Sequence, residues 1–114
     1  IKSYLGVVPK NDADGVLQDI HWSMGGFGYF PTYALGNLVS AQIWNKLTDD
    51  IPTISQKIEN GDFSQLLTWL RANIHMHGSK FEPQELVQKI TGSKITYKHY
   101  MKYLTEKYSD IYSL

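Results

Sequence analysis

The chain has 114 residues, with eleven basic and eleven acidic side chains, so its formal net charge at pH 7 is zero. A neutral chain lacks the basic surface that binding to nucleic acids or to anionic membranes requires, and no apolar run is long enough to span a bilayer. This length suits one small domain, and the absence of cysteine excludes a disulfide framework, a thiol nucleophile and a cysteine zinc site while favouring a reducing cytoplasm.

The first 22 residues show little helical periodicity. The stretch Lys10–Gly15 is rich in turn-forming residues, and we expect a solvated turn there. Its Asp12 and Asp14 could suggest calcium, but the twelve-residue calcium loop with its central glycine and terminal glutamate is missing. We therefore predict no calcium site in this part of the chain.

The strongest predicted helix covers residues 30 to 48. Pro31 suits its first turn, because a missing N–H costs nothing at that position. Residues then recur at spacings of three and four, as expected for one face of a helix; these are Leu35, Leu38, Val39, Gln42, Ile43 and Leu47. We expect the helix to end at the Asp-Asp-Ile-Pro sequence 49–52.

The remaining helices follow at short intervals. A short helix is expected over 53–59, and a longer one over 63–76 with an Asp62–Gln65 capping box and a left-handed stop at Gly78. Pro83 should open a further helix that Gly92 closes, and Thr96 should cap the last helix. No strand-like alternation is present, so residues 1–114 are predicted to form a single all-α segment, a bundle of about five helices.

Polar groups crowd into the segment Gly15–Trp22, with the sequence Gly-Val-Leu-Gln-Asp-Ile-His-Trp. It places an amide, a carboxylate, an imidazole and an indole within five residues, outside any amphipathic pattern. A buried polar group without a partner costs about 1–3 kcal/mol. Such a cluster therefore indicates a function rather than packing.

This segment resembles the G-x-x-Q-D-x-H-W signature of the Taq-type zinc metallocarboxypeptidases. The stretches 28–33 (Gly-Tyr-Phe-Pro-Thr-Tyr), 35–37 (Leu-Gly-Asn) and 69–75 (Trp-Leu-Arg-Ala-Asn-Ile-His) are also similar to that family. The resemblance covers nearly the whole chain. It implies an all-helical, gluzincin-type peptidase that removes C-terminal residues from peptides and is cytoplasmic and often dimeric.

The family's metal motif, H-E-x-x-H, is absent from this sequence. Two histidines one helical turn apart hold zinc in such motifs, and the intervening glutamate serves as general base. The resemblance therefore implies that the chain is a C-terminal piece, inactive by itself, with zinc or another divalent metal held by an upstream part. The first residue, Ile1, also fits a piece of a larger protein. Expected partners are a peptide substrate, the upstream part and a second copy.

The resemblance also implies which residues of this chain serve catalysis. Related helical peptidases use a histidine and a tyrosine about a dozen residues apart to stabilise the oxyanion, and His21 and Tyr33 match that pair. Tyr29 is a weaker candidate for the same role. The expected substrate-binding or supporting residues are Gln18, Asp19, Trp22, Tyr29 and Gly26. Asp19 is expected to orient His21, and Gly25, Gly26 and Gly28 to let the backbone approach the peptide.

Other interpretations of these residues are also compatible with the sequence. His21 could be a core histidine and Tyr33 an ordinary interface aromatic. The chain could also be a non-catalytic helical interaction module or oligomerisation domain that uses the aromatic surface between Trp22 and Tyr33. Under either function, residues 16–34 lack covering helices, so we expect this surface to be hidden by dimerisation or element exchange.

Two further sequence patterns could suggest a ligand-binding site, but their residues do not fit one. The Gly26-Phe27-Gly28 sequence is no dinucleotide loop, because Pro31 takes the third glycine position. His75 and His77 lie two residues apart, so on a helix they point to different faces and cannot coordinate one metal ion together. His99 is predicted to lie on the surface, and no metal ligand is assigned to this chain.

Overall fold

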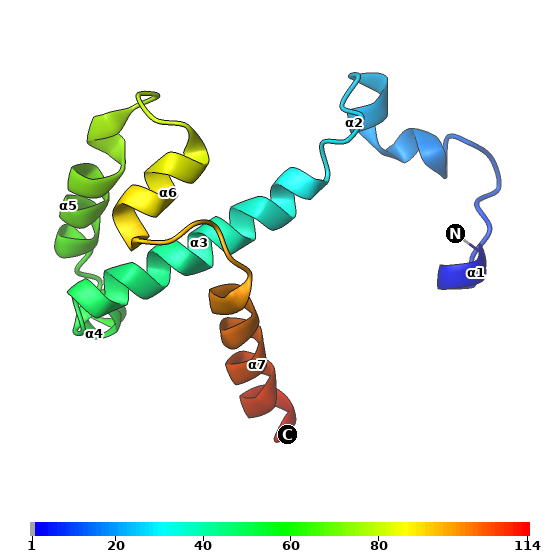
Figure 1. Cartoon of the computed structure of the whole chain (residues 1–114). Helices are drawn as coiled ribbons and strands as arrows, with labels where there is room; N and C mark the ends of the chain where they lie inside the picture. The colour runs from blue at the N-terminus through cyan, green and yellow to red at the C-terminus, as the bar shows by residue number, and fades with distance from the viewer. Residues whose placement is uncertain (1) are drawn as a thin grey trace. The chain divides into compact units, whose positions relative to one another are not determined.

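The computed structural model describes residues 2–114, which form helices, turns and loops without a strand (Figure 1). The predicted all-α class is therefore confirmed. The chain divides into two compact units, the first ending at Tyr33 and the second comprising Ala34–Leu114.

The first unit consists of short turns of helix joined by loops. It contains α1 (Lys2–Leu5), the 3₁₀ turn η1 (Val16–Gln18) and α2 (Ile20–Ser23), followed by the first residues of α3 (Pro31–Asp50). The sequence did not predict α1 or α2, because a four-residue helix is too short to show an amphipathic period. None of the residues in α1, η1 and α2 is buried, so local hydrogen bonds carry much of the structure there.

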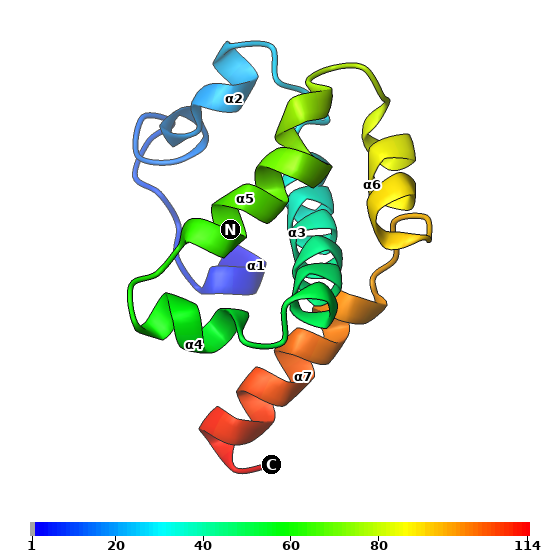
Figure 2. The ribbon, with the colours of Figure 1, turned by 90° about the vertical axis from the view of Figure 1, so that its left-hand side faces the viewer.

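The second unit contains the remaining helices, and all five helices predicted from the sequence are present. After α3 come α4 (Ile54–Glu59), α5 (Ser64–Asn73), η2 (His75–His77), α6 (Pro83–Thr91) and α7 (Lys98–Tyr112). Figures 1 and 2 show α4, α5 and α6 gathered beside the C-terminal half of α3, whereas α7 begins next to α3 and runs away from α5 and α6. Pro83 opens α6 and left-handed Gly92 ends it, as predicted.

Some helix boundaries differ from the predicted ones. α5 starts at Ser64, and Asp62 lies one residue too early to form the predicted box with Gln65. The Asp62 carboxylate accepts hydrogen bonds from the hydroxyl and backbone N–H of Ser64 and faces the Lys57 ammonium, which together lower its pKa to about 2. The capping box lies at Glu82 instead, whose N–H donates to the Glu85 carboxylate.

The ends of α5 and α7 also depart from the predictions. α5 stops at Asn73, and Gly78, although it has a positive φ of 52°, follows η2 rather than α5. The residue that precedes the first turn of α7 is Tyr97, not Thr96. Thr96 still contributes locally, because its hydroxyl accepts a long 3.4 Å bond from the Lys98 N–H.

The apolar core lies where α3, α4, α5 and α6 meet. It consists of Leu47, Ile54, Trp69 and Ile90, and the half-buried side chains packed against it are Ile43, Ile51, Ile58, Leu66, Leu70, Ile74 and Leu86. The indole N–H of Trp69 donates to the Asp50 carboxylate at 2.9 Å, so the end of α3 is fixed to α5. This core holds α3 against α4, α5 and α6.

A buried amide connects α3 to the loop between α6 and α7. Gln42 is only 1% exposed, and its Oε1 accepts the backbone N–H of Thr96 at 3.0 Å. Its Nε2 lies within hydrogen-bond distance of several acceptors, which its two N–H groups must share; these are the hydroxyls of Thr91 and Ser93 and the carbonyls of Ser93 and Lys94. Gln42 thereby fixes the start of α7 against α3.

We expect Gln42→Ala to lower the free energy of unfolding by about 1–3 kcal/mol, because the buried amide and its hydrogen bonds to Thr96 and Ser93 are lost. Urea unfolding followed by circular dichroism measures this change. Gln56→Ala, at an exposed position of α4, is the matched control and should change stability by less than about 0.5 kcal/mol. Equal effects of the two substitutions would contradict a structural role for the Gln42 amide.

Candidate active site

The short helix α2 carries His21, and the residue before it holds the imidazole in place. Asp19 caps α2: its Oδ1 accepts the backbone N–H of His21 at 2.7 Å and lies 2.9 Å from the His21 Nδ1. The backbone bond and then the side-chain bond from His21 lower the pKa of the Asp19 carboxyl. One carboxylate oxygen therefore fixes both the helix start and the ring.

The other ring nitrogen of His21 faces Tyr33, twelve residues further along. The His21 Nε2 lies 2.9 Å from the Tyr33 hydroxyl, and the two rings meet edge to face with centroids 6.0 Å apart. Tyr33 is the third residue of α3, just after Pro31. The three side chains thus form a continuous hydrogen-bonded line, Asp19–His21–Tyr33, which we call the relay.

Aromatic rings surround the imidazole. Tyr29 stacks on His21 with centroids 5.5 Å apart, and Phe30 approaches it to 5.0 Å. Tyr29 also meets Tyr33 edge to face at 5.3 Å. The His21 side chain nevertheless remains 30% exposed, so the ring is held by its neighbours without being closed off from solvent or a ligand.

The glycines between α2 and α3 serve different purposes. Gly25 and Gly28 have positive φ angles of 77° and 74°, which L side chains rarely adopt. Gly26 has no positive φ; its N–H donates to the backbone carbonyl oxygen of His21 at 2.6 Å. An added Cβ at Gly26 would lie only 2.9 Å from that oxygen. The structure therefore brings Gly26 against the backbone of His21.

An open pocket of about 300 Å³ borders the relay. Its lining residues are Ile20, His21, Met24, Gly26, Tyr29 and Tyr33. Of the other residues expected to bind substrate, Gln18 is exposed and donates its amide to the Ala13 carbonyl in the preceding turn. Trp22 is 47% exposed and does not line the pocket. The structure thus brings Asp19, His21, Gly26, Tyr29 and Tyr33 together and leaves Gln18 and Trp22 outside.

Residues 2–114 do not fit a metal centre. No group of three or more histidine, cysteine, aspartate or glutamate side chains among them could hold an ion. His75 and His77 lie in η2, and the His77 ring packs against Phe81 at 5.3 Å. His99 was predicted to lie on the surface, but it is half-buried, because its part of α7 lies against α3 and lines a pocket with Trp44 and Tyr103.

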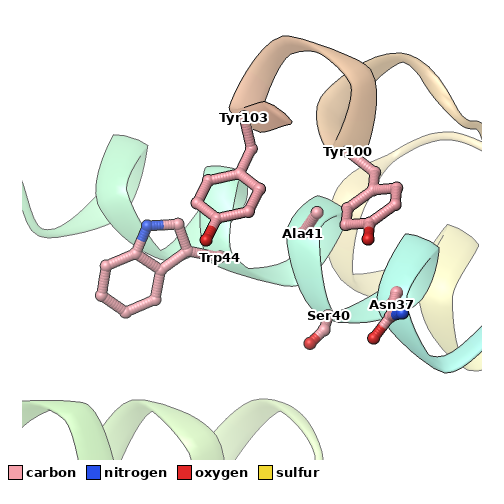
Figure 3. A pocket seen from close by; sticks show the side chains of 6 residues that line it. All are labelled: Asn37, Ser40, Ala41, Trp44, Tyr100 and Tyr103. Carbon is pink, nitrogen blue, oxygen red and sulfur yellow. The ribbon is translucent and has the colours of Figure 1, made fainter. Parts of the chain in front are cut away.

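A second aromatic hollow was not predicted from the sequence. Trp44 of α3 and Tyr100 and Tyr103 of α7 surround a pocket of about 400 Å³ (Figure 3), which is also lined by Asn37, Ser40 and Ala41. The α3 residues recur at spacings of three and four, so one helix face carries them. That spacing was the available signal, but it could not show that α7 returns to this face.

None of the helices in the described part of the chain is long and apolar enough to cross a membrane.

The comparisons with known proteins agree on one family. The family model for carboxypeptidase Taq (M32) metallopeptidases matches residues 1–108. The chain is 40% identical over 113 residues to carboxypeptidase 1 of Bacillus subtilis, covering 99% of this chain and 23% of that protein. It is 43% identical over 111 residues to thermostable carboxypeptidase 1 of Thermus thermophilus, covering 97% of this chain and 22% of that protein.

A solved structure shows the same relationship. The M32 carboxypeptidase of Deinococcus radiodurans superposes with a TM-score of 0.85 at 38% identity, covering 99% of this chain and 23% of that one. The chain thus spans less than a quarter of the length of these relatives. The family expected from the sequence motifs is confirmed, and the chain belongs to the carboxypeptidase Taq (M32) metallopeptidase family.

Proposed function

We propose that this chain is the C-terminal part of a zinc metallocarboxypeptidase that removes amino acids from the C-terminus of peptides. In this proposal the relay supplies polar contacts to the peptide bond under attack. The observation that carries it is the pair of 2.9 Å contacts that join Asp19, His21 and Tyr33. Family membership suggests the reaction, and the relay suggests which residues of this chain assist it.

Peptide hydrolysis builds negative charge on the oxygen of the scissile carbonyl. Preorganised hydrogen-bond donors aimed at that oxygen stabilise it without reorganising during the reaction. Tyr33 is held by the first turn of α3 and His21 by the Asp19 cap. Because the relay borders an open pocket, a substrate carbonyl can reach the Tyr33 hydroxyl from solvent.

The other proposed contacts follow from where the side chains lie. Tyr29 and Gly26 line the pocket, so they are placed to contact a peptide there. Asp19 acts on His21 rather than on the substrate. Gln18 and Trp22 lie outside the pocket, and we propose that they contact the more distant part of a peptide. All five residues are half-buried or exposed.

The metal belongs to a part of the enzyme that this chain does not span. Because the residues present do not fit a metal centre, we propose that zinc or another divalent ion is held elsewhere and that the isolated chain is inactive. The exposed apolar side chains of the first unit, among them Ile20, Trp22 and Phe27, would then face the rest of the protein or a second copy. A cytoplasmic location is part of the same proposal.

The same exposed side chains also favour one alternative. Trp22, Phe27, Tyr29 and Phe30 are each more than 40% exposed, as a non-catalytic interaction or oligomerisation module would require. Such a module has no need for an ordered relay at a pocket. The peptidase proposal explains both features, because the aromatic surface surrounds the relay.

A chimera tests the peptidase proposal. We would replace the segment of Bacillus subtilis carboxypeptidase 1 that aligns with this chain, at 40% identity, by residues 1–114. With zinc added, the folded chimera should release C-terminal amino acids from blocked peptides, as measured by chromatography. The 114-residue chain with zinc, as the control, should release none. A folded chimera without activity would contradict the peptidase proposal.

A further inference from the structure

The last helix carries an apolar stripe that its own unit leaves exposed. Residues of α7, and the one directly before it, recur at alternating spacings of four and three, which aligns them along one side of the helix as in a coiled coil. These residues, which we call the seam, are Tyr97, Met101, Leu104, Tyr108 and Ile111. Leu104 is half-buried, and the other four are each at least 44% exposed. The seam therefore lacks a partner within the second unit.

α7 contacts α3 through its opposite side. The residues of α7 that line a pocket together with residues of α3 are His99, Lys102, Tyr103 and Glu106. At 3.6 residues per turn, His99 and Glu106 lie about half a turn away from the middle of the seam. A helix that served only this unit would turn its apolar side inward. α7 instead turns its more polar side toward α3, and it runs away from α5 and α6 (Figures 1 and 2).

The charges beside the seam are all basic. In a coiled coil, the positions next to the apolar line face the flanks of the partner helix, where opposite charges stabilise the pair. The exposed Lys98 and Lys107 take such positions in α7. The other flanking residues within the helix are uncharged; they are Tyr100, Thr105 and Tyr112. Glu106 and Asp110 lie on the other side of α7, so the seam favours a partner helix with acidic flanks.

The same charges argue against pairing with a second copy of α7. Two copies in either direction would bring only lysines and uncharged residues together on the two flanks, so no ion pair could form there. Most of the length of the relatives, by contrast, lies outside the segment that this chain matches, which is 23% of carboxypeptidase 1 of Bacillus subtilis. A helix in the corresponding part of this enzyme would belong to the same polypeptide as α7, so its packing would not require two molecules to associate.

We propose that a helix with acidic flanks, in the part of the enzyme that this chain does not span, packs along the seam and pairs with Lys98 and Lys107. The inference rests on family membership and on the residues of α7. It goes beyond the proposed function, because it does not depend on catalysis by the relay. It gives the last helix the task of holding this chain to the rest of the enzyme.

The first test uses the folded chimera and a carbodiimide, which joins a lysine amine directly to a carboxylate in contact with it. Mass spectrometry of the digested product should find Lys98 and Lys107 linked to aspartates or glutamates of the Bacillus subtilis part of the same polypeptide. Lys102 is the control, because its ammonium lies 3.8 Å from the Glu106 carboxylate of its own helix and should link there. Links of Lys98 and Lys107 only within residues 1–114, or only between two chimeras, would overturn the inference.

The second test makes one substitution in two settings. Met101→Gln keeps helix propensity nearly unchanged, and Met101 is 49% exposed in this chain. The substitution should therefore shift the Tm of the isolated 114-residue chain by less than about 1 °C. In the chimera the amide would be buried in the seam, and we expect Tm to fall by at least about 2 °C. Lys102→Gln, on the other side of α7, should change little in either protein.

Equal small shifts of Tm in the two settings would show that the seam stays in water and would overturn the inference. Neither test measures peptide hydrolysis. A folded chimera that releases no amino acids therefore contradicts the peptidase proposal, while its cross-links and its Tm still decide what covers the seam.

Discussion

Tyr33→Phe in the chimera is expected to lower kcat by about 10²–10³-fold with little change in KM. The phenol is proposed to donate to charge that develops only in the transition state, and loss of one such donor has effects of that size. The substitution removes a single oxygen and leaves the ring packing against His21 and Tyr29 in place. Steady-state kinetics with a blocked dipeptide measures both constants.

Tyr29→Phe is the matched control for this experiment. Tyr29 lines the same pocket and contacts the same imidazole through a ring stack, whereas Tyr33 contributes a hydrogen bond. We expect less than about a tenfold loss of kcat from this change. An unchanged kcat in Tyr33→Phe, or equal losses in both variants, would remove Tyr33 from the proposed mechanism.

The helices of the second unit could be predicted because their signals are local. Apolar residues recur along α3 at helical spacing, and Pro83 and Gly92 mark the ends of α6 by backbone geometry alone. The start of α5 was predicted one residue too early. Asp62 accepts the backbone N–H of Ser64, but an aspartate can accept such a bond either as the residue directly before a helix or from one position further back. The sequence does not distinguish these two positions.

The candidate site depended on a different kind of signal. His21 and Tyr33 were selected by resemblance to a family motif, since a single turn such as α2 leaves no periodic trace in sequence. The packing of Phe30 on His21 and the approach of Gly26 to the His21 carbonyl arise from the loop that joins α2 to α3. No spacing rule fixes the path of such a loop, so these contacts could not be predicted.

Leu47→Ala is expected to lower the free energy of unfolding of the second unit by about 3 kcal/mol. Leu47 is 1% exposed and belongs to the core cluster with Ile54, Trp69 and Ile90. Truncating a fully buried leucine loses the transfer free energy of three carbons and leaves a cavity that its neighbours only partly fill. Urea unfolding followed by circular dichroism measures this loss.

Leu67→Ala makes the same chemical change on α5, where the leucine is 39% exposed. Water already reaches that side chain, so little apolar surface is lost from the core and no closed cavity forms. We expect a change below about 1 kcal/mol. Because both variants lose identical atoms, any difference in their unfolding midpoints measures burial. Equal destabilisation would mean that the surface around Leu67 is covered in solution, as contact with a second copy would produce, and sedimentation at several concentrations would detect that contact.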